Sequence, residues 1–173
     1  FQETIRNLKE VAPVSFSSMP IRYAMLLEAL ERDDDLGRGF FRNLRRLTTS
    51  GARLPDTVYA GLQAQAVKHT GHKIPFGSAY GSTETSAAVT CVFWPTDRSG
   101  LIGLPHPGVE LKLIPMDGAR YEVRVKSPAV TPGYLGQPQL NAQVFDDEGF
   151  FLMGDAATFV DPQQPLEGLA FGG

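Results

Sequence analysis

Small hydroxyl residues and a single carboxylate follow directly on a short apolar run in the segment FGSAYGSTETSAAV, from Phe76 to Val89. A strand that ends in Gly-Ser-Thr exposes backbone N–H groups and two hydroxyls in a tight turn, which is the arrangement of an anion-binding nest. The lysine-containing pattern G-x-x-x-x-G-K-[ST] of the Walker A loop is absent from the chain. The segment therefore indicates either a phosphate site of another kind or a plain polar turn between a strand and a loop.

Glu84 restricts which ligands this turn can bind. A bare carboxylate repels a phosphate by roughly 4 kcal/mol at a separation of about 4 Å and an effective dielectric constant near ~20. A divalent cation between the two reverses the sign, because Mg²⁺ binds one or two carboxylates together with substrate phosphate oxygens. If the turn binds a phosphate, Thr83 would contact it, Glu84 would hold Mg²⁺, and the ring of Tyr80 would be free to stack on a base. The alternative of a plain polar turn stays open for this motif taken alone.

Two further glycine turns accompany this segment. TTSGARLP, residues 48–55, is the end of a predicted strand, and FFLMGDAATF, residues 150–159, places Asp155 after a glycine in a predicted hairpin. A carboxylate in such a position can accept hydrogen bonds from two ribose hydroxyls. An isolated Gly-Asp pair is by itself more typical of an ordinary turn. Only the order of the motifs along the chain distinguishes a nucleotide site from such a turn.

The first half of the chain alternates between helix and strand patterns. Pro20 begins the predicted helix PIRYAMLLEALER, and Pro55 and Gly71 bound a second one. RRLTTSGA and KIPFGSAYG are predicted strands, whereas the acidic run DDDLGRG is predicted to be a solvated turn. This alternation predicts an α/β subdomain with a mostly parallel sheet and covering helices.

The second half changes to strict alternation of apolar and polar residues. VELKLIPMDGARYEVRVKS predicts an antiparallel hairpin that turns at Asp117-Gly118 and has one face in water. DDEGFFLMGDAATFV predicts a second hairpin that turns at Glu148-Gly149, and residues 138–143 predict one helical turn. The expected fold class is therefore α/β plus β, with residues 1–97 in part of an α/β subdomain and residues 98–173 in a small distorted antiparallel β-barrel.

Composition excludes several classes of protein. The chain has 173 residues, of which 42% are hydrophobic and 20% charged, and a formal net charge of -3. The mild acidity gives no electrostatic reason to expect nucleic acid or an anionic membrane as a partner, and no apolar run approaches the ~20 residues that span a bilayer. One cysteine excludes an internal disulfide and, without a recognisable signal peptide, favours the cytoplasm. No feature of the sequence indicates the oligomeric state.

Five motifs, taken in order, resemble those of the adenylate-forming superfamily of acyl-CoA synthetases, peptide-synthetase adenylation domains and luciferases. They are SGARL (50–54), YGSTE (80–84), GLIGLPHPGVELKLI (100–114), VTPGY (130–134) and DDEGFFLMGD (146–155). Five motifs in the family's order over nearly the whole chain are far more specific than any one of them. Within the superfamily, FWPTDRSGLIGLP and YEVRVKSPAVTPGYLGQP look most similar to bacterial feruloyl-CoA synthetases.

The resemblance implies a ligase that works in two steps. The carboxylate of the acid attacks the α-phosphate of ATP, and coenzyme A then takes the acyl group from the acyl-adenylate. Such chemistry needs charge neutralisation at phosphorus and close positioning more than it needs a protein nucleophile. The implied cofactors are ATP, Mg²⁺ and coenzyme A as co-substrate, and the implied acid is ferulate or another hydroxycinnamate.

The resemblance also assigns roles to residues of this chain. Thr83 would contact the α-phosphate, Glu84 would hold Mg²⁺, and Asp155 would bind the ribose hydroxyls. The other nucleotide-binding residues would be Gly51, Ala52, Arg53, Tyr80, Gly81 and Ser82. Small residues would wall an acyl pocket with room for a flat aromatic acid, and these are Ala79, Gly81, Ala87 and Ala88, with Ser17 and Ser18 on the opposite side.

Two parts of the family pattern are missing from this sequence. They are the Ser/Thr/Gly-rich phosphate loop that precedes these motifs and the mobile C-terminal catalytic domain with its lysine. We therefore expect a piece of the large N-terminal domain that does not turn over by itself. The alternatives are a ligase for a fatty acid or benzoate, a non-catalytic nucleotide-binding module, and a structural α/β domain whose glycine turns serve only the backbone.

Overall fold

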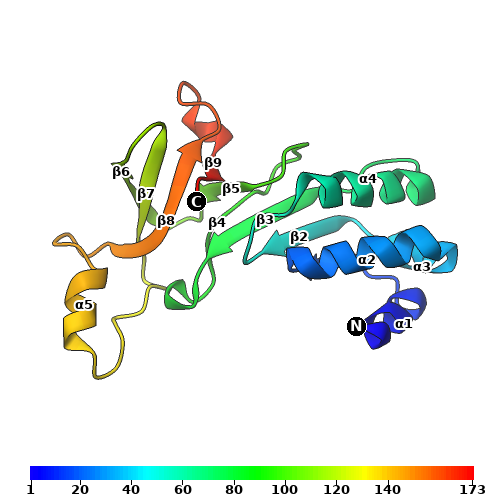
Figure 1. The fold of residues 1–173 in the computed structure, drawn as a ribbon, viewed down its shortest axis with the longest axis horizontal. Coiled ribbons are helices and arrows are strands. Elements are labelled where there is room, and N and C mark those ends of the chain that lie inside the picture. Colours follow the sequence, from blue (N-terminus) through cyan, green and yellow to red (C-terminus); the bar gives the residue numbers. More distant parts are fainter. The chain divides into compact units, whose positions relative to one another are not determined.

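The computed structural model describes all 173 residues, which divide into two compact units (Figure 1). The first unit is formed by Phe1–Gly77 with Trp94–Gly100, and the second by Ser78–Phe93 with Leu101–Gly173. Strand β3 (Phe76–Gly81) belongs to the first unit at its start and to the second for the rest of its length. No helix in the chain is long and apolar enough to cross a membrane.

The first unit alternates helices with strands, as predicted. It contains helices α1 (Gln2–Glu10), α2 (Pro20–Arg32), α3 (Asp34–Phe41) and α4 (Asp56–Thr70), and strands β1 (Ser15–Ser18) and β2 (Arg46–Ser50). Strands β1 and β2 pair in parallel, with Ser15 opposite Arg46 and Ser18 opposite Thr49. The α/β character of this part of the chain is thereby confirmed.

Buried polar groups tie the helices of the first unit to its strands. Tyr23 of α2 is fully buried, and its hydroxyl lies 3.0 Å from the carbonyl of Phe16 in β1 and 2.8 Å from that of Thr48 in β2. Gln63 of α4 is also buried, and its side-chain amide pairs with the backbone of Ile74 through bonds of 2.8 and 3.1 Å. Since a buried polar group without a partner would be costly, these bonds fix where the helices can lie.

The prediction of a solvated turn at DDDLGRG is wrong, because this run begins helix α3. The side chain of Asp33 accepts a hydrogen bond of 3.0 Å from the backbone N–H of Leu36, so Asp33 is the N-cap. Asp34 and Asp35 occupy the first turn, where negative charge is favourable at the positive end of the helix dipole. The acidic run is therefore a helix start, and the apolar residues that follow it, Phe40 among them, enter the core.

The second unit is an antiparallel sheet with one short helix. Its elements are the end of β3, the turn η1 (Thr83–Thr85), β4 (Ala88–Cys91), β5 (Leu101–Pro105), β6 (Glu110–Pro115), β7 (Arg120–Lys126), α5 (Pro138–Val144), β8 (Phe151–Phe159), η2 (Pro165–Glu167) and β9 (Leu169–Phe171). Within this unit the strand order is β3-β4-β5-β9-β8-β7-β6, and every neighbouring pair is antiparallel (Figure 1).

The predicted β-barrel is not formed. Strand β6 is the last in the order and pairs with β7 alone, so the sheet is open. Alternation of apolar and polar residues specifies which face of a strand is buried, whereas closure depends on the tilt and stagger of all strands together. The sequence pattern therefore predicted strands β6, β7 and β8 of this unit but not whether the sheet closes.

The two predicted hairpins have different outcomes. The first is confirmed, because β6 and β7 pair from Glu110 opposite Lys126 to Pro115 opposite Tyr121. The second is only partly formed, because a turn precedes β8 but only one isolated bridge, Phe145 to Phe151, stands where its first strand was expected. Helix α5 occupies the chain just before this turn, which leaves no room for a longer strand.

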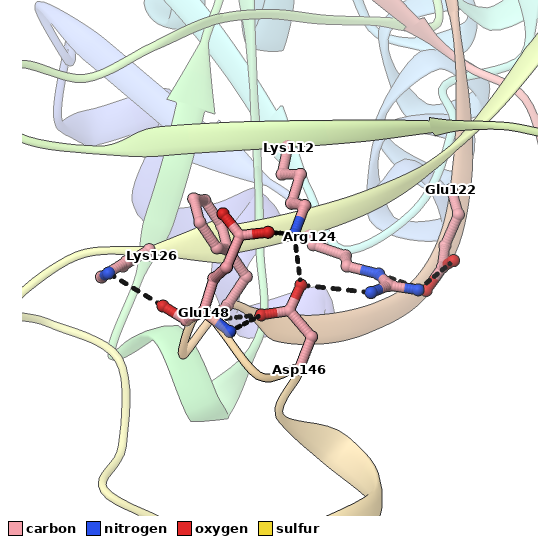
Figure 2. A network of polar contacts seen from close by, with 7 residues as sticks. Lys112, Glu122, Arg124, Lys126, Asp146 and Glu148 are labelled. Atoms are coloured by element: carbon pink, nitrogen blue, oxygen red, sulfur yellow. Dashed lines mark hydrogen bonds and ion pairs between the residues drawn. The ribbon is translucent and has the colours of Figure 1, made fainter.

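The polar face of β6 and β7 carries a network centred on Asp146 (Figure 2). The Asp146 carboxylate accepts hydrogen bonds from Lys112 Nζ at 2.9 Å and Arg124 Nη1 at 3.1 Å, and from the backbone N–H groups of Glu148 and Phe150. Two further members complete the network, Glu122 bonded to Arg124 and Lys126 bonded to the Glu148 carbonyl. The Lys112 ammonium, with Phe150 N–H and Arg124, holds the pKa of the Asp146 carboxyl well below its usual range.

This network predicts an acid-sensitive contribution to stability. A carboxyl whose pKa is lowered by folding stabilises the fold above its unfolded pKa and loses that contribution as pH falls toward the folded value. We expect Asp146→Asn to lower the urea midpoint at pH 7, and the difference from wild type to shrink as pH falls below the ordinary value of 3.8. Urea titrations between neutral and acid pH measure it, with the exposed neighbour Asp147 changed to Asn as the control. Equal losses in the two variants at neutral pH would contradict the role of the network.

Candidate active site

The predicted anion nest lies where β3 ends and the chain turns back into β4. The strand register pairs Ala79 with Cys91 and, after a bulge, Gly81 with Ala88. A Cβ added to Gly81 would lie closer than 3.0 Å to the backbone of Ala87, so no larger residue fits at this turn. The structure thus brings the four small residues predicted to wall an acyl pocket into one hairpin.

Thr85, a residue to which the sequence analysis gave no role, shapes the turn. It is only 1% exposed, and its hydroxyl accepts a 2.9 Å hydrogen bond from the Ser82 N–H and donates a 2.7 Å bond to the Ala87 carbonyl. These bonds close the turn from the inside and leave Thr83 exposed and Glu84 half-buried. The S-x-x-T spacing of a capping box was the signal in the sequence that could have identified this residue.

A tyrosine 50 positions away in the sequence holds the Glu84 carboxylate. The hydroxyl of Tyr134 donates a hydrogen bond of 2.8 Å to Glu84 Oε1. This donor favours the ionised carboxylate and keeps the pKa of Glu84 below its ordinary value, while the carboxylate raises the pKa of Tyr134. Tyr134 belongs to the VTPGY motif, which the sequence analysis noted without assigning the tyrosine a role.

Tyr80 and Asp155 meet although they are 75 positions apart in the sequence. The Tyr80 hydroxyl donates a hydrogen bond of 2.9 Å to Asp155 Oδ2. Burial, and then the neighbouring carboxylate, raises the pKa of Tyr80, so the phenol stays protonated and remains a donor. The residue predicted to stack on a base and the residue predicted to bind ribose are therefore neighbours within the second unit.

Asp155 does not lie in a hairpin turn, as the sequence had suggested, but within strand β8. Opposite β7, Leu152 pairs with Arg124 and Ala156 with Glu122, so β8 carries extra residues at this point. Gly154 supplies the bulge with a φ of 77°, in the left-handed region that glycine favours. The Gly-Asp pair is thus a strand irregularity that turns the carboxylate toward Tyr80.

The remaining predicted site residues lie in the first unit. Gly51 follows β2 with a φ of 83°, which confirms the glycine turn, and Arg53 forms a 3.4 Å ion pair with Asp56. Ser17 and Ser18 end strand β1 and line a cavity of about 170 Å³ next to Phe16. The adenine contact of Gly51, Ala52 and Arg53 and the acyl-pocket role of the two serines stay predictions.

Glu84 is the candidate metal ligand at this turn, and it is not part of a cage of ligands. No group of three or more His, Cys, Asp or Glu side chains lies close enough to hold one. Mg²⁺ needs no such cage, because it retains several waters and binds through one or two carboxylates and substrate phosphates. Glu84, whose Oε1 accepts the hydrogen bond from Tyr134, fits a Mg²⁺ ion that arrives with a nucleotide.

Comparison with protein families and curated proteins gives consistent matches. A family model described as AMP-binding enzyme matches residues 2–135. Malonate–CoA ligase of Arabidopsis thaliana is 29% identical over 148 residues, which cover 82% of this chain and 23% of the relative. Phenylacetyl-CoA ligase epaB of Aspergillus niger is 35% identical over 122 residues, which cover 66% of this chain and 22% of the relative. The chain thus spans about a quarter of the length of these curated relatives.

Solved structures give the same result for the fold. A malonyl-CoA ligase in a ternary product complex with methylmalonyl-CoA and AMP matches with a TM-score of 0.78 and 28% identity, over 100% of this chain and 36% of that one. A long-chain-fatty-acid-CoA ligase from Archaeoglobus fulgidus matches with a TM-score of 0.79 at 20% identity, over 99% of this chain and 36% of that one, which shows a shared fold.

Proposed function

Because this chain belongs to the AMP-binding enzyme family, we propose that it is part of an ATP-dependent acid–thiol ligase. The whole protein would adenylate a carboxylic acid and transfer the acyl group to coenzyme A. The relatives are named as ligases for malonate and for phenylacetate, and one solved relative holds AMP and a coenzyme A thioester. The proposal extends this shared activity to a protein of which the present chain is one segment.

The observation that carries the proposal is the convergence of distant residues on one turn. The turn after β3 holds Thr83 and Glu84, and the hydrogen bond from Tyr80 to Asp155 joins β3 to the bulge of β8 at 2.9 Å. In the proposed site Thr83 contacts the α-phosphate, Asp155 accepts hydrogen bonds from the ribose hydroxyls, and the Tyr80 ring lies against adenine. A bound Mg²⁺ ion held by Glu84 would neutralise phosphate charge.

Positioning is what these residues would contribute to the reaction. Attack of a carboxylate on the α-phosphate needs the two reactants held in line and the phosphate charge compensated, and no protein nucleophile takes part. Tyr80 and Asp155 would fix the nucleoside, while Gly81 and Ser82 would let the backbone approach the phosphates. The resemblance also assigns Gly51, Ala52 and Arg53, which belong to the first unit, to adenine binding.

For the acid, we propose ferulate or a related hydroxycinnamate. Ala79, Ala87 and Ala88 each carry only a methyl group, and a wall of such residues would leave room for a flat ring. The resemblance also assigns Ser17 and Ser18, which belong to the first unit, to acid binding. The alternative acids are fatty acids, benzoate, malonate and phenylacetate. The proposed location is the cytoplasm for any of them.

Exchange of pyrophosphate with ATP tests this function directly. We expect the whole protein to catalyse acid-dependent exchange that is strongest with ferulate or p-coumarate, and the isolated 173-residue chain to catalyse none. Benzoate, octanoate, malonate and phenylacetate would be offered separately as competitors. Exchange with one of these acids alone would keep the mechanism and replace the substrate. Nucleotide binding without exchange for any acid would point to a non-catalytic module.

A further inference from the structure

We propose that Tyr134 is a positioning residue for the Glu84 carboxylate, and that Asn141 holds Tyr134 in place for this task. The inference rests on the proposed function, because it takes Glu84 to be the ligand of the nucleotide's Mg²⁺ ion. The phenol of Tyr134 donates its hydrogen bond to Glu84 Oε1 at 2.8 Å. This bond holds the carboxylate in the orientation in which it would meet the cation.

Two further hydrogen bonds join the loop before α5 to the η1 turn and the residue after it. The N–H of Thr131 donates a 2.7 Å hydrogen bond to the Glu84 carbonyl, and the Ser86 hydroxyl donates a 2.7 Å bond to the Ala129 carbonyl. Glu84 is therefore held through both its main chain and its side chain by a segment far along the sequence. Such a fastening restricts the rotamer of Glu84 before any ligand arrives.

Tyr134 is in turn held by the first helix that follows it. The side-chain oxygen of Asn141 in α5 accepts a 2.8 Å hydrogen bond from the Tyr134 N–H, and its amide nitrogen donates a 3.0 Å bond to the Tyr134 carbonyl. Gly133 makes this approach possible, since its φ is 137° and an added Cβ would lie 2.8 Å from the Asn141 amide. The oxygen and the nitrogen of the Asn141 amide therefore both form hydrogen bonds with the backbone of Tyr134.

Calorimetric titration of the whole protein with Mg·ATP, and with ATP in the presence of EDTA, tests the inference without measuring turnover. We expect Tyr134→Phe to weaken Mg·ATP binding about tenfold, as is typical of one lost hydrogen bond to a charged group, and to leave metal-free ATP binding unchanged. Asn141→Ala, which keeps the phenol, should show a smaller loss of the same kind.

A matched control is available in the same unit. Tyr121 packs its ring against Phe159 at 5.4 Å, and Tyr121→Phe also removes one hydroxyl, so it should leave both affinities unchanged. In a Glu84→Gln background, Tyr134→Phe should have no further effect on Mg·ATP binding. Wild-type binding of Mg·ATP is the premise, and its absence would count against the proposed function rather than against this inference.

Two results would overturn the positioning role. In the first, Tyr134→Phe binds Mg·ATP with the same affinity as wild type. In the second, the variant loses affinity for metal-free ATP to the same degree, which would make Tyr134 a purely structural residue. Should Tyr134→Phe lose its fold, Asn141→Ala carries the same comparison.

Discussion

Replacing Gly103 with alanine is expected to unfold the second unit. Gly103 lies in β5 with a φ of 82°, and an added Cβ would come closer than 3.0 Å to the carbonyl of Cys91 and the N–H of Val92. Both are backbone atoms of the adjoining β4 segment, so no side chain can move aside. Left-handed strain adds about 1 to 2 kcal/mol for a residue with a Cβ. A total cost above about 4 kcal/mol is a large share of the stability of a typical domain.

Gly118→Ala is the matched control for this substitution. Gly118 also has a positive φ, 68°, but lies in the β6–β7 turn with nothing within 4 Å of an added Cβ. It should therefore lose only the strain contribution, whereas Gly103→Ala should fail to give a cooperative unfolding transition in urea followed by circular dichroism. A similar midpoint for both variants would mean that β4 and β5 do not approach as closely as described.

Replacing Glu84 with glutamine is expected to remove most of the metal-dependent adenylation by the whole protein. The amide keeps the size of the side chain and can still accept a bond from Tyr134, but it carries no charge for a cation. We expect the rate of pyrophosphate exchange to fall by about a hundredfold or more, as for the loss of one group that stabilises charge in the transition state. Binding of ATP without metal should be retained.

The exposed carboxylate of Glu110, at the start of β6 in the same unit, gives the control. Glu110→Gln removes the same charge from the second unit and should leave exchange unchanged. Exchange by Glu84→Gln at the wild-type rate would exclude Glu84 as the metal ligand. Loss of nucleotide affinity in the absence of metal would instead show that the turn itself had been disrupted.

The elements that followed from the sequence are those whose signals are local. Helix α4 begins after Pro55 and ends at Gly71 as predicted, and the β6–β7 hairpin turns at Asp117-Gly118, because proline, glycine and periodic apolar residues act over a few positions. Helix α3 was missed although its signal was also local. Three acids in a row are also typical of a solvated turn, so the N-cap pattern of Asp33 does not by itself identify the helix.

In the candidate site, too, the features with local signals could be predicted and the contacts between distant residues could not. The sequence predicted that Glu84 requires a cation if the turn binds phosphate, and the order of five motifs indicated a family that the comparison then showed. It did not predict Thr85 as the residue that closes the turn, nor Tyr134 as the partner of Glu84. It also placed Asp155 in a hairpin turn, when the carboxylate lies at a bulge inside β8.

The sequence by itself thus determined helices α2 and α4, the β6–β7 hairpin and the motifs that indicate the family. The tertiary structure decided that the sheet stays open and that Tyr80 meets Asp155 and Tyr134 meets Glu84, across 75 and 50 positions of the chain. The physical reason is the range of the forces involved. Dihedral preferences and hydrophobic periodicity act between near neighbours, whereas a hydrogen bond between distant side chains forms only after register, bulges and packing have brought their strands and loops together.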